Sequence, residues 1–123
     1  MRRQSVSSWV SKRSRACEFS PEARKEIYER DKGLCIFCQR GILGPRNWME
    51  SQINGIMHFI PRSQGGLGIP QNGALGCNYH HFMLDNGVDD EMRLLLREVF
   101  ERYLKAHYPG WNKEELVYDK YRN

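Results

Sequence analysis

The sequence predicts a small α+β domain in which helices flank two short strands and a metal ion ties distant parts of the chain together. The strands are expected at residues 55–60 and 72–75, because both segments are apolar and a glycine-rich loop joins them. Two pairs of candidate zinc ligands, 38 residues apart, would link the parts of a core that is small for its surface. Helical start signals or spacing occur at residues 21–30, 78–85 and from 89 onward.

Capping residues mark the first helix, and an apolar stripe marks the last. Ser20 can cap the first helix and Pro21 suits its first turn, while Gly33 ends it soon after Arg30. The last helix begins at the acidic residues 89–91, and we interpret its apolar stripe as core. The stripe consists of Met92, Leu95, Leu96, Val99, Phe100, Tyr103 and Leu104.

The remaining segments are expected to be loops held by aromatic side chains. Trp48 is the expected anchor of the loop at residues 39–54, which contains several turn-forming residues. Beyond the last helix, the tail is expected to fold back on the core through Trp111, Leu116, Val117, Tyr118 and Tyr121.

We divide the chain into a basic flexible arm at residues 1–18, a central domain at residues 19–87, and a C-terminal helix and tail at residues 88–123 that pack on the same domain. Residues 1–16 carry five basic and no acidic side chains, so the net charge of +4 resides there. Such an arm attracts the phosphates of a polyanion without sequence preference. The alternative is a solvated tail that binds nothing.

Composition argues against a membrane or secreted protein. No apolar run approaches the ~20 residues that cross a bilayer, and no apolar segment follows the basic N-terminus. The four cysteines do not suggest a disulfide framework, because Cys77 is matched with a histidine and Cys17 has no partner. We therefore expect a reducing compartment, the cytoplasm.

The pairs Cys35-x-x-Cys38 and Cys77-x-x-His80 have the spacing of two half-sites for tetrahedral zinc. We predict one structural zinc ion on these four residues. A redox-active Cys-x-x-Cys is the alternative, although it would not need the second pair.

His81 follows His80 directly, and on a helix its side chain should leave about 100° away from that of its neighbour. It should therefore be free of the zinc site and share a face with Asp85, four residues on. One short helix could thus hold a structural ion on one side and a working divalent ion on the other.

Several short segments occur in a characteristic order. They are Arg30-Asp31-Lys32-Gly33-x-Cys35-x-x-Cys38, His58-Phe59-Ile60-Pro61-Arg62-Ser63-Gln64-Gly65-Gly66, Asn72-Gly73, Cys77-x-x-His80-His81 and Asp85-x-Gly87. Together they resemble the motif of the HNH endonucleases that contain zinc, and small phage-type members carry comparable extensions. The resemblance covers residues 20–87.

The resemblance implies a ββα-metal (His-Me finger) fold, in which a β-hairpin presents His58 and a helix presents metal ligands. It implies that His58 is the general base, that Asn72 braces the hairpin loop and that His81 binds the catalytic metal. Asp85 matches a second helical ligand present in some members. The implied reaction is hydrolysis of DNA phosphodiester bonds, by nicking or by double-strand cleavage.

The chemistry of these residues is consistent with that reaction. A neutral imidazole has a pKa suited to taking a proton from water, and a divalent cation relieves charge at the phosphate. Mg²⁺ would bind loosely to one imidazole and one carboxylate, whereas Mn²⁺ or Ni²⁺ tolerates imidazole better. Arg62 could grip a neighbouring phosphate, and Arg13 and Arg15 of the basic arm could bind others. Met57 departs from the family, because many members have a metal-binding Asp or His there.

The alternative function is a degenerate HNH module that binds nucleic acid or protein without catalysis. In that case His58, Asn72 and Asp85 would be dispensable, whereas the four zinc ligands would remain essential. DNA is the expected partner and no membrane partner is expected. A monomer and a dimer are both consistent with the sequence.

Overall fold

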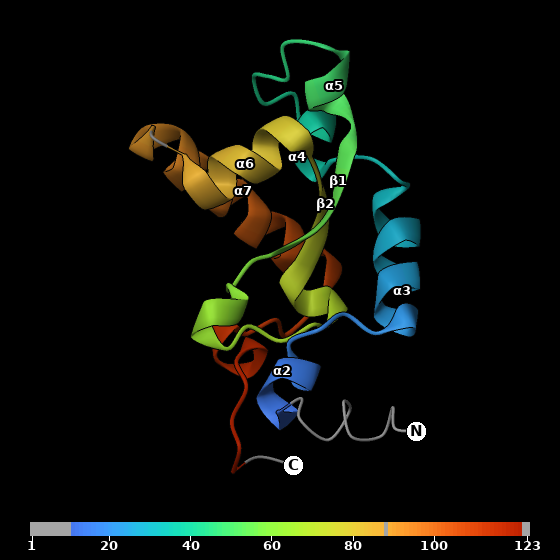
Figure 1. The fold of residues 1–123 in the computed structure, drawn as a ribbon, viewed down its shortest axis with the longest axis vertical. Helices are drawn as coiled ribbons and strands as arrows, with labels where there is room; N and C mark the ends of the chain where they lie inside the picture. The colour runs from blue at the N-terminus through green and yellow to red at the C-terminus, as the bar shows by residue number, and fades with distance from the viewer. Residues whose placement is uncertain (1–10, 88, 122–123) are drawn as a thin grey trace, which may run out of the picture.

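The computed structural model describes residues 11–87 and 89–121. A two-stranded antiparallel sheet lies at the centre with helices on both of its faces, which confirms the predicted α+β class (Figure 1). The elements in chain order are α2 (Lys12–Ala16), α3 (Pro21–Asp31), α4 (Ile36–Gln39), α5 (Trp48–Ser51), β1 (Ile53–His58), the 3-10 helices η1 (Arg62–Gln64) and η2 (Pro70–Asn72), β2 (Gly73–Cys77), α6 (Asn78–Asn86), α7 (Asp90–His107) and η3 (Lys113–Leu116).

The sheet is a hairpin of β1 and β2, paired from Ile53 opposite Cys77 to His58 opposite Gly73. Both strands begin or end within a few residues of their predicted positions, and β1 ends at His58 rather than continuing to Ile60. The chain therefore leaves the sheet directly after His58. Strand β2 passes directly into α6, so hairpin and helix follow each other without a linker.

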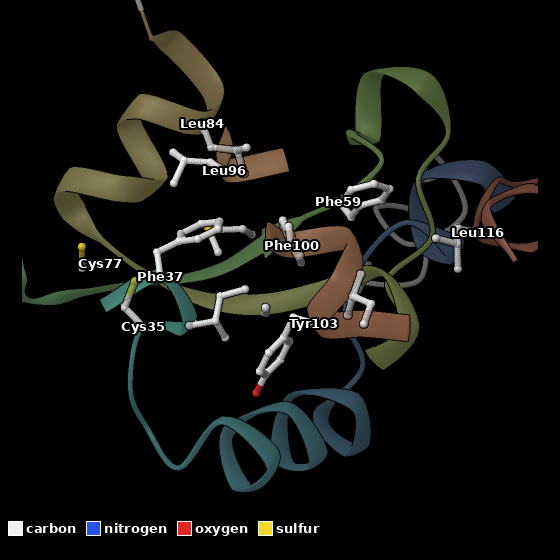
Figure 2. Close-up of a cluster of buried hydrophobic side chains, with 13 residues drawn as sticks. Cys35, Phe37, Phe59, Cys77, Leu84, Leu96, Phe100, Tyr103 and Leu116 are labelled. Carbon is white, nitrogen blue, oxygen red and sulfur yellow. The ribbon is translucent and has the colours of Figure 1, made fainter. Parts of the chain in front are cut away.

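The two faces of the hairpin are covered by separate cores. On one face, three residues of the α3 region, Phe19, Ala23 and Ile27, pack on Leu75 of β2. The larger core lies on the other face, where α4, α6 and α7 meet the sheet (Figure 2). The Phe100 ring of α7 lies edge-on to the rings of Phe37 and Phe59, with centroids 6.1 and 5.3 Å apart. Helix α7 therefore completes the core of the central domain.

A buried carboxylate joins α3 to the other layers. Asp31 has no exposed surface and accepts hydrogen bonds from the Arg30 guanidinium at 2.7 and 3.0 Å and from the backbone N–H of Leu75 at 2.9 Å. The Tyr103 hydroxyl of α7 also donates to it, and Figure 2 shows this ring pointing toward α3. Because a buried charge is costly unless it is fully paired, this network fixes where α3 sits on the hairpin.

The predicted cap at Ser20 and most of the predicted stripe are confirmed. The Ser20 side chain accepts from the N–H of Ala23 at 3.1 Å, and Asp89 caps α7 in the same way. Leu95 is an exception, because 41% of its surface is exposed. The helices in the described ranges include none that is both long and apolar enough to cross a membrane. The residues of the α7 stripe that are buried are Leu96, Phe100, Tyr103 and Leu104.

Two predicted aromatic anchors are wrong. Trp48 is 73% exposed at the start of α5, a helix of four residues in which no residue is buried (Figure 1). Tyr121 is 85% exposed near the C-terminus. The tail is held instead by Leu116, which is buried, and by Trp111, whose indole N–H donates to the Gln71 carbonyl at 2.7 Å.

The N-terminal region differs from the flexible arm expected at residues 1–18. Helix α2 forms within it, and Cys17 is buried. The backbone N–H of Gly68 donates to the Ala16 carbonyl at 2.9 Å. A Cβ at Gly68 would lie 2.2 Å from the Glu18 carbonyl carbon, so the segment can approach only because this residue is a glycine. Residues 1–10 of the predicted arm lie outside the described residues.

Candidate metal centres and active site

The four predicted zinc ligands converge. The ligand atoms of Cys35, Cys38, Cys77 and His80 all lie within 4.8 Å of one another. The three sulfurs are 3.7, 3.7 and 3.4 Å from His80 Nδ1, and the sulfurs of Cys38 and Cys77 are 3.8 Å apart. A tetrahedron with metal–sulfur bonds of about 2.3 Å has edges of about 3.8 Å, so this cluster could hold a zinc ion.

The surroundings of the cluster orient its imidazole and shift the pKa values of its thiols. The Nε2–H of His80 donates to the Leu43 carbonyl at 2.9 Å, which orients the ring and leaves Nδ1 as the ligand nitrogen. In the chain alone, burial raises the pKa of the Cys35 and Cys38 thiols, and at Cys38 the neighbouring thiolates add to this. A bound cation would reverse the effect by stabilising the thiolates. Cys17 lies outside the cluster, and none of the described cysteines forms a disulfide.

The residue after His80 faces a different site. His58, His81 and Asp85 all line one pocket of about 740 Å³, whose walls are β1, the loop after it, α6 and the first half of α7. Helix α6 thus carries His80 into the cysteine cluster and His81 into the pocket. This is the arrangement expected for consecutive residues on a helix.

The pair of His81 and Asp85 has the geometry of two ligands of one cation. His81 Nε2 lies 3.1 Å from Asp85 Oδ2. Adjacent ligands of an octahedral ion with bonds of about 2.1 Å are about 3 Å apart, so both atoms fit one divalent cation. The other ring nitrogen of His81, Nδ1, is buried and has no hydrogen-bond partner among the described residues, which costs about 1–3 kcal/mol. With only two protein ligands, such an ion would keep positions for water and phosphate oxygens.

The His58 ring is held by the N-terminal segment. Its Nε2–H donates to the Cys17 carbonyl at 2.9 Å, and the ring of Phe19 lies against it with centroids 4.5 Å apart. The neutral ring therefore has its free lone pair on Nδ1. Burial lowers the pKa of His58, and the positive charge of Arg62 lowers it further. A neutral imidazole in a fixed tautomer is suited to accept a proton at neutral pH.

Asn72 acts at a distance from the pocket. It has no exposed surface, and its side-chain amide accepts from the Ile60 N–H at 2.8 Å and donates to the carbonyls of Ile60 at 3.2 Å and Leu67 at 2.8 Å. Its own carbonyl accepts from the Phe59 N–H at 2.8 Å. These bonds hold both ends of the loop that follows His58, as expected of a bracing residue.

The structure separates the remaining predicted site residues. Arg62 lines the pocket, whereas Arg13 lies beside it and donates to the Ser63 carbonyl at 3.4 Å, and Arg15 is not part of the pocket wall. Met57 has no exposed surface and belongs to the larger core, on the opposite face of β1 from His58. The Met57 thioether therefore faces the core and not the pocket.

Sequence reasoning missed two groups of contacts. Arg93 and Arg97 of α7 line the pocket, although α7 lies beyond the motif. Their spacing of four residues, which places two cations on one helix face, is the signal that could have identified them. The other missed contact is the Cys17 carbonyl that orients His58, and a backbone contact of this kind leaves no mark in the sequence.

A comparison with protein families, with curated proteins and with solved structures gave no match. The fold and the site define a small α+β domain with one closed cluster of three cysteines and a histidine, and one open pocket. The pocket combines an oriented neutral imidazole, a candidate cation site and several arginines. Its function is therefore inferred from this geometry.

Proposed function

We propose that the protein is a metal-dependent endonuclease of the HNH type, which hydrolyses DNA phosphodiester bonds. The observation that carries the proposal is the meeting of His58, His81 and Asp85 in one pocket, while His80 belongs to the separate cysteine cluster. The direct succession of β1, β2 and α6 supports a ββα-metal fold. The motif order across residues 20–87 supports the same family.

In the proposed reaction His58 is the general base. Nδ1 takes a proton from a water molecule, the water oxygen attacks the phosphorus, and the bond from phosphorus to the 3′-oxygen breaks. The 3′-oxygen receives a proton from solvent, which gives the 5′-phosphate and 3′-hydroxyl ends expected for this family. The hydrogen bond to the Cys17 carbonyl supports this role, because it also stabilises the ring once it is protonated.

His81 and Asp85 would hold the catalytic cation, such as Mg²⁺, Mn²⁺ or Ni²⁺. When bound, the cation supplies charge relief at the phosphate and the leaving oxygen. Asn72 keeps the loop after β1 in place and so positions His58 without touching the substrate. The cysteine cluster, loaded with zinc, would hold α4 and α6 together and so fix the orientation of His81.

A plasmid-nicking assay in Mg²⁺, Mn²⁺ and Ni²⁺ tests the proposal. His58→Ala should lower the nicking rate by about 10²- to 10⁴-fold, because general base catalysis is lost. Zinc content and melting temperature should stay at the values of the parent. His107→Ala is the matched control, because this histidine is exposed on α7 and does not line the pocket.

Equal nicking by His58→Ala and the parent would overturn the catalytic assignment. The non-catalytic zinc module predicts that no variant or parent cuts DNA in any of these ions, while the four-residue cluster still binds zinc. The assay therefore separates the two functions. The form of the plasmid product, open-circular or linear, separates nicking from double-strand cutting.

A further inference from the structure

The wall of the pocket formed by α7 contains an arginine, Arg97, that forms no ion pair within 4.0 Å with a described carboxylate. Arg97 is half-buried, its guanidinium lies over the Phe59 ring at 4.5 Å, and one of its N–H groups donates to the Phe59 carbonyl at 3.1 Å. Phe59 directly follows His58, so the guanidinium is fixed relative to the proposed general base. Most of its five N–H donors remain available for a ligand.

The charge of Arg97 lies in an unfavourable environment. Among the described residues, no carboxylate lies within 4.0 Å of its guanidinium. Burial lowers the pKa of Arg97, the negative charge of Glu101 partly opposes this, and the like charge of Arg93, one helical turn away, lowers it further. Arg93 itself pairs with the exposed Asp90 at 2.7 Å. Two cations on one helix face cost stability, and an anion bound between them would offset that cost.

Arginines also occur on the opposite wall. Arg62 enters the pocket from the loop after β1, and its nearest carboxylate, that of Glu18, is 3.9 Å away. The walls of the pocket thus carry three arginines and a single carboxylate, Asp85, which is itself assigned to the cation. Positive charge therefore stands on both sides of the proposed reaction centre.

We propose that Arg97, assisted by Arg93, binds phosphates of the DNA backbone next to the bond that is cut, across the pocket from Arg62. This inference rests on the proposed function and adds a substrate-binding wall from α7. A guanidinium binds phosphate oxygens through parallel N–H donors, which suits this role. Contacts of this kind fix the strand without reading bases, so they act equally on DNA of any sequence.

The test measures DNA binding in a protein that does not cleave. In the His58→Ala background, Arg97→Gln should weaken binding of a 12-base-pair duplex by about tenfold, and the slope of log affinity against log salt should fall by about one. Two duplexes of unrelated sequence should lose affinity equally. Arg102→Gln is the control, because that arginine is exposed and pairs with Glu98 on α7 outside the pocket.

Arg93→Gln provides an independent variant, because its partners are at the surface and its loss should leave the core intact. It should also weaken binding and lower the salt slope, by less than Arg97→Gln. Melting temperatures identify any variant that has lost its fold. If Arg97→Gln does not fold, the binding of Arg93→Gln decides whether the inference holds. Compared with Arg97→Gln, Arg97→Lys should restore part of the slope of log affinity against log salt, because lysine carries the charge but lacks the planar guanidinium.

Binding by Arg97→Gln and Arg93→Gln that matches Arg102→Gln would overturn the inference, even if the parent cuts plasmid normally. Unequal losses on the two duplexes would overturn the assignment to the backbone. If the intact protein neither binds nor cuts DNA, the proposed function fails and this inference fails with it.

Discussion

The two sides of α6 carry the same residue type in opposite settings. His80 is fully buried, and its Nδ1 lies 3.4–3.7 Å from three cysteine sulfurs, an arrangement that could hold a tetrahedral zinc ion. His81 lines an open pocket and has one neighbouring ligand, Asp85, together with a ring nitrogen that lacks a partner. A metal ion with four protein ligands has no coordination position left for a substrate, whereas an ion with fewer protein ligands does.

The difference lies in the surroundings and the accessibility of each ring, since the residue type is the same. Both histidines come from one helical turn and from consecutive positions. What differs is the set of groups that the rest of the fold brings to each ring. The α4 region and Cys77 supply thiols around His80, while β1 and α7 bring His58 and two arginines to the pocket that His81 lines.

The largest effect should come from removing one ligand of the cysteine cluster around His80. Cys77→Ser keeps a side chain that can cap α6 but removes one thiolate, so the protein should lose its bound zinc. The free energy of unfolding should fall by on the order of 5 kcal/mol, because binding of a structural ion contributes directly to folding. Zinc analysis of the purified protein and thermal melts would measure both effects.

Cys17→Ser is the control for that experiment, because Cys17 is buried but lies outside the cluster. It should retain one zinc ion per chain. A Cys77→Ser protein with full zinc content and an unchanged melting temperature would contradict a structural role for the cysteine cluster.

On the open side, Asp85→Asn should raise the Mn²⁺ concentration for half-maximal nicking by about 10- to 100-fold. The amide is a weaker ligand than the carboxylate, and the zinc content should not change because Asp85 does not touch the cluster. A titration of nicking rate against Mn²⁺ measures the shift. Glu98→Gln, a carboxylate on α7 outside the pocket, should leave the titration as it is.

The pH dependence should report on His58. Burial lowers its pKa, so the ring is neutral at pH 7 and becomes charged only as the pH falls below about 6.5. Because the base must be neutral, nicking should be constant through neutral pH and fall on the acid side. The folded-state pKa lies below the unfolded one, so proton uptake also favours the unfolded state in that range. An acid limb with its midpoint well above pH 6.5 would contradict the assignment.

The smallest effect is expected from the arm. Deleting residues 1–10 removes Arg2 and Arg3 and leaves α2 in place, so the packing beneath His58 should persist. The slope of log DNA affinity against log salt should fall by at most about 2, with nicking at low salt unchanged. An unchanged slope would assign residues 1–10 no part in binding.

Local patterns were enough to predict much of this molecule. Helix α3 was located because the capping residue Ser20 precedes Pro21, and α7 because acidic residues precede an apolar stripe at helical spacing. The cysteine cluster was predicted because ligand pairs at fixed spacing are visible in the sequence. The opposite directions of His80 and His81 followed from helix geometry alone.

Other features depend on packing between distant segments, which no local pattern records. Trp48 was expected to anchor its loop, but it lies on α5, in which no residue is buried. Arg97 resembles an ordinary solvated residue of an amphipathic helix until α7 is placed against β1. The docking of residues 11–18 depends on the space beside Gly68, and that space exists only in the folded chain.

A single peptide bond joins the two sites on α6. The helix can neither turn nor slide to improve one ligand set without displacing the other. One residue inserted between Cys77 and Asp85 would rotate everything beyond it by about 100° and misalign at least one site. This segment should therefore tolerate exchange of its outward-facing side chains, whereas any change in its length should abolish zinc binding, cleavage or both.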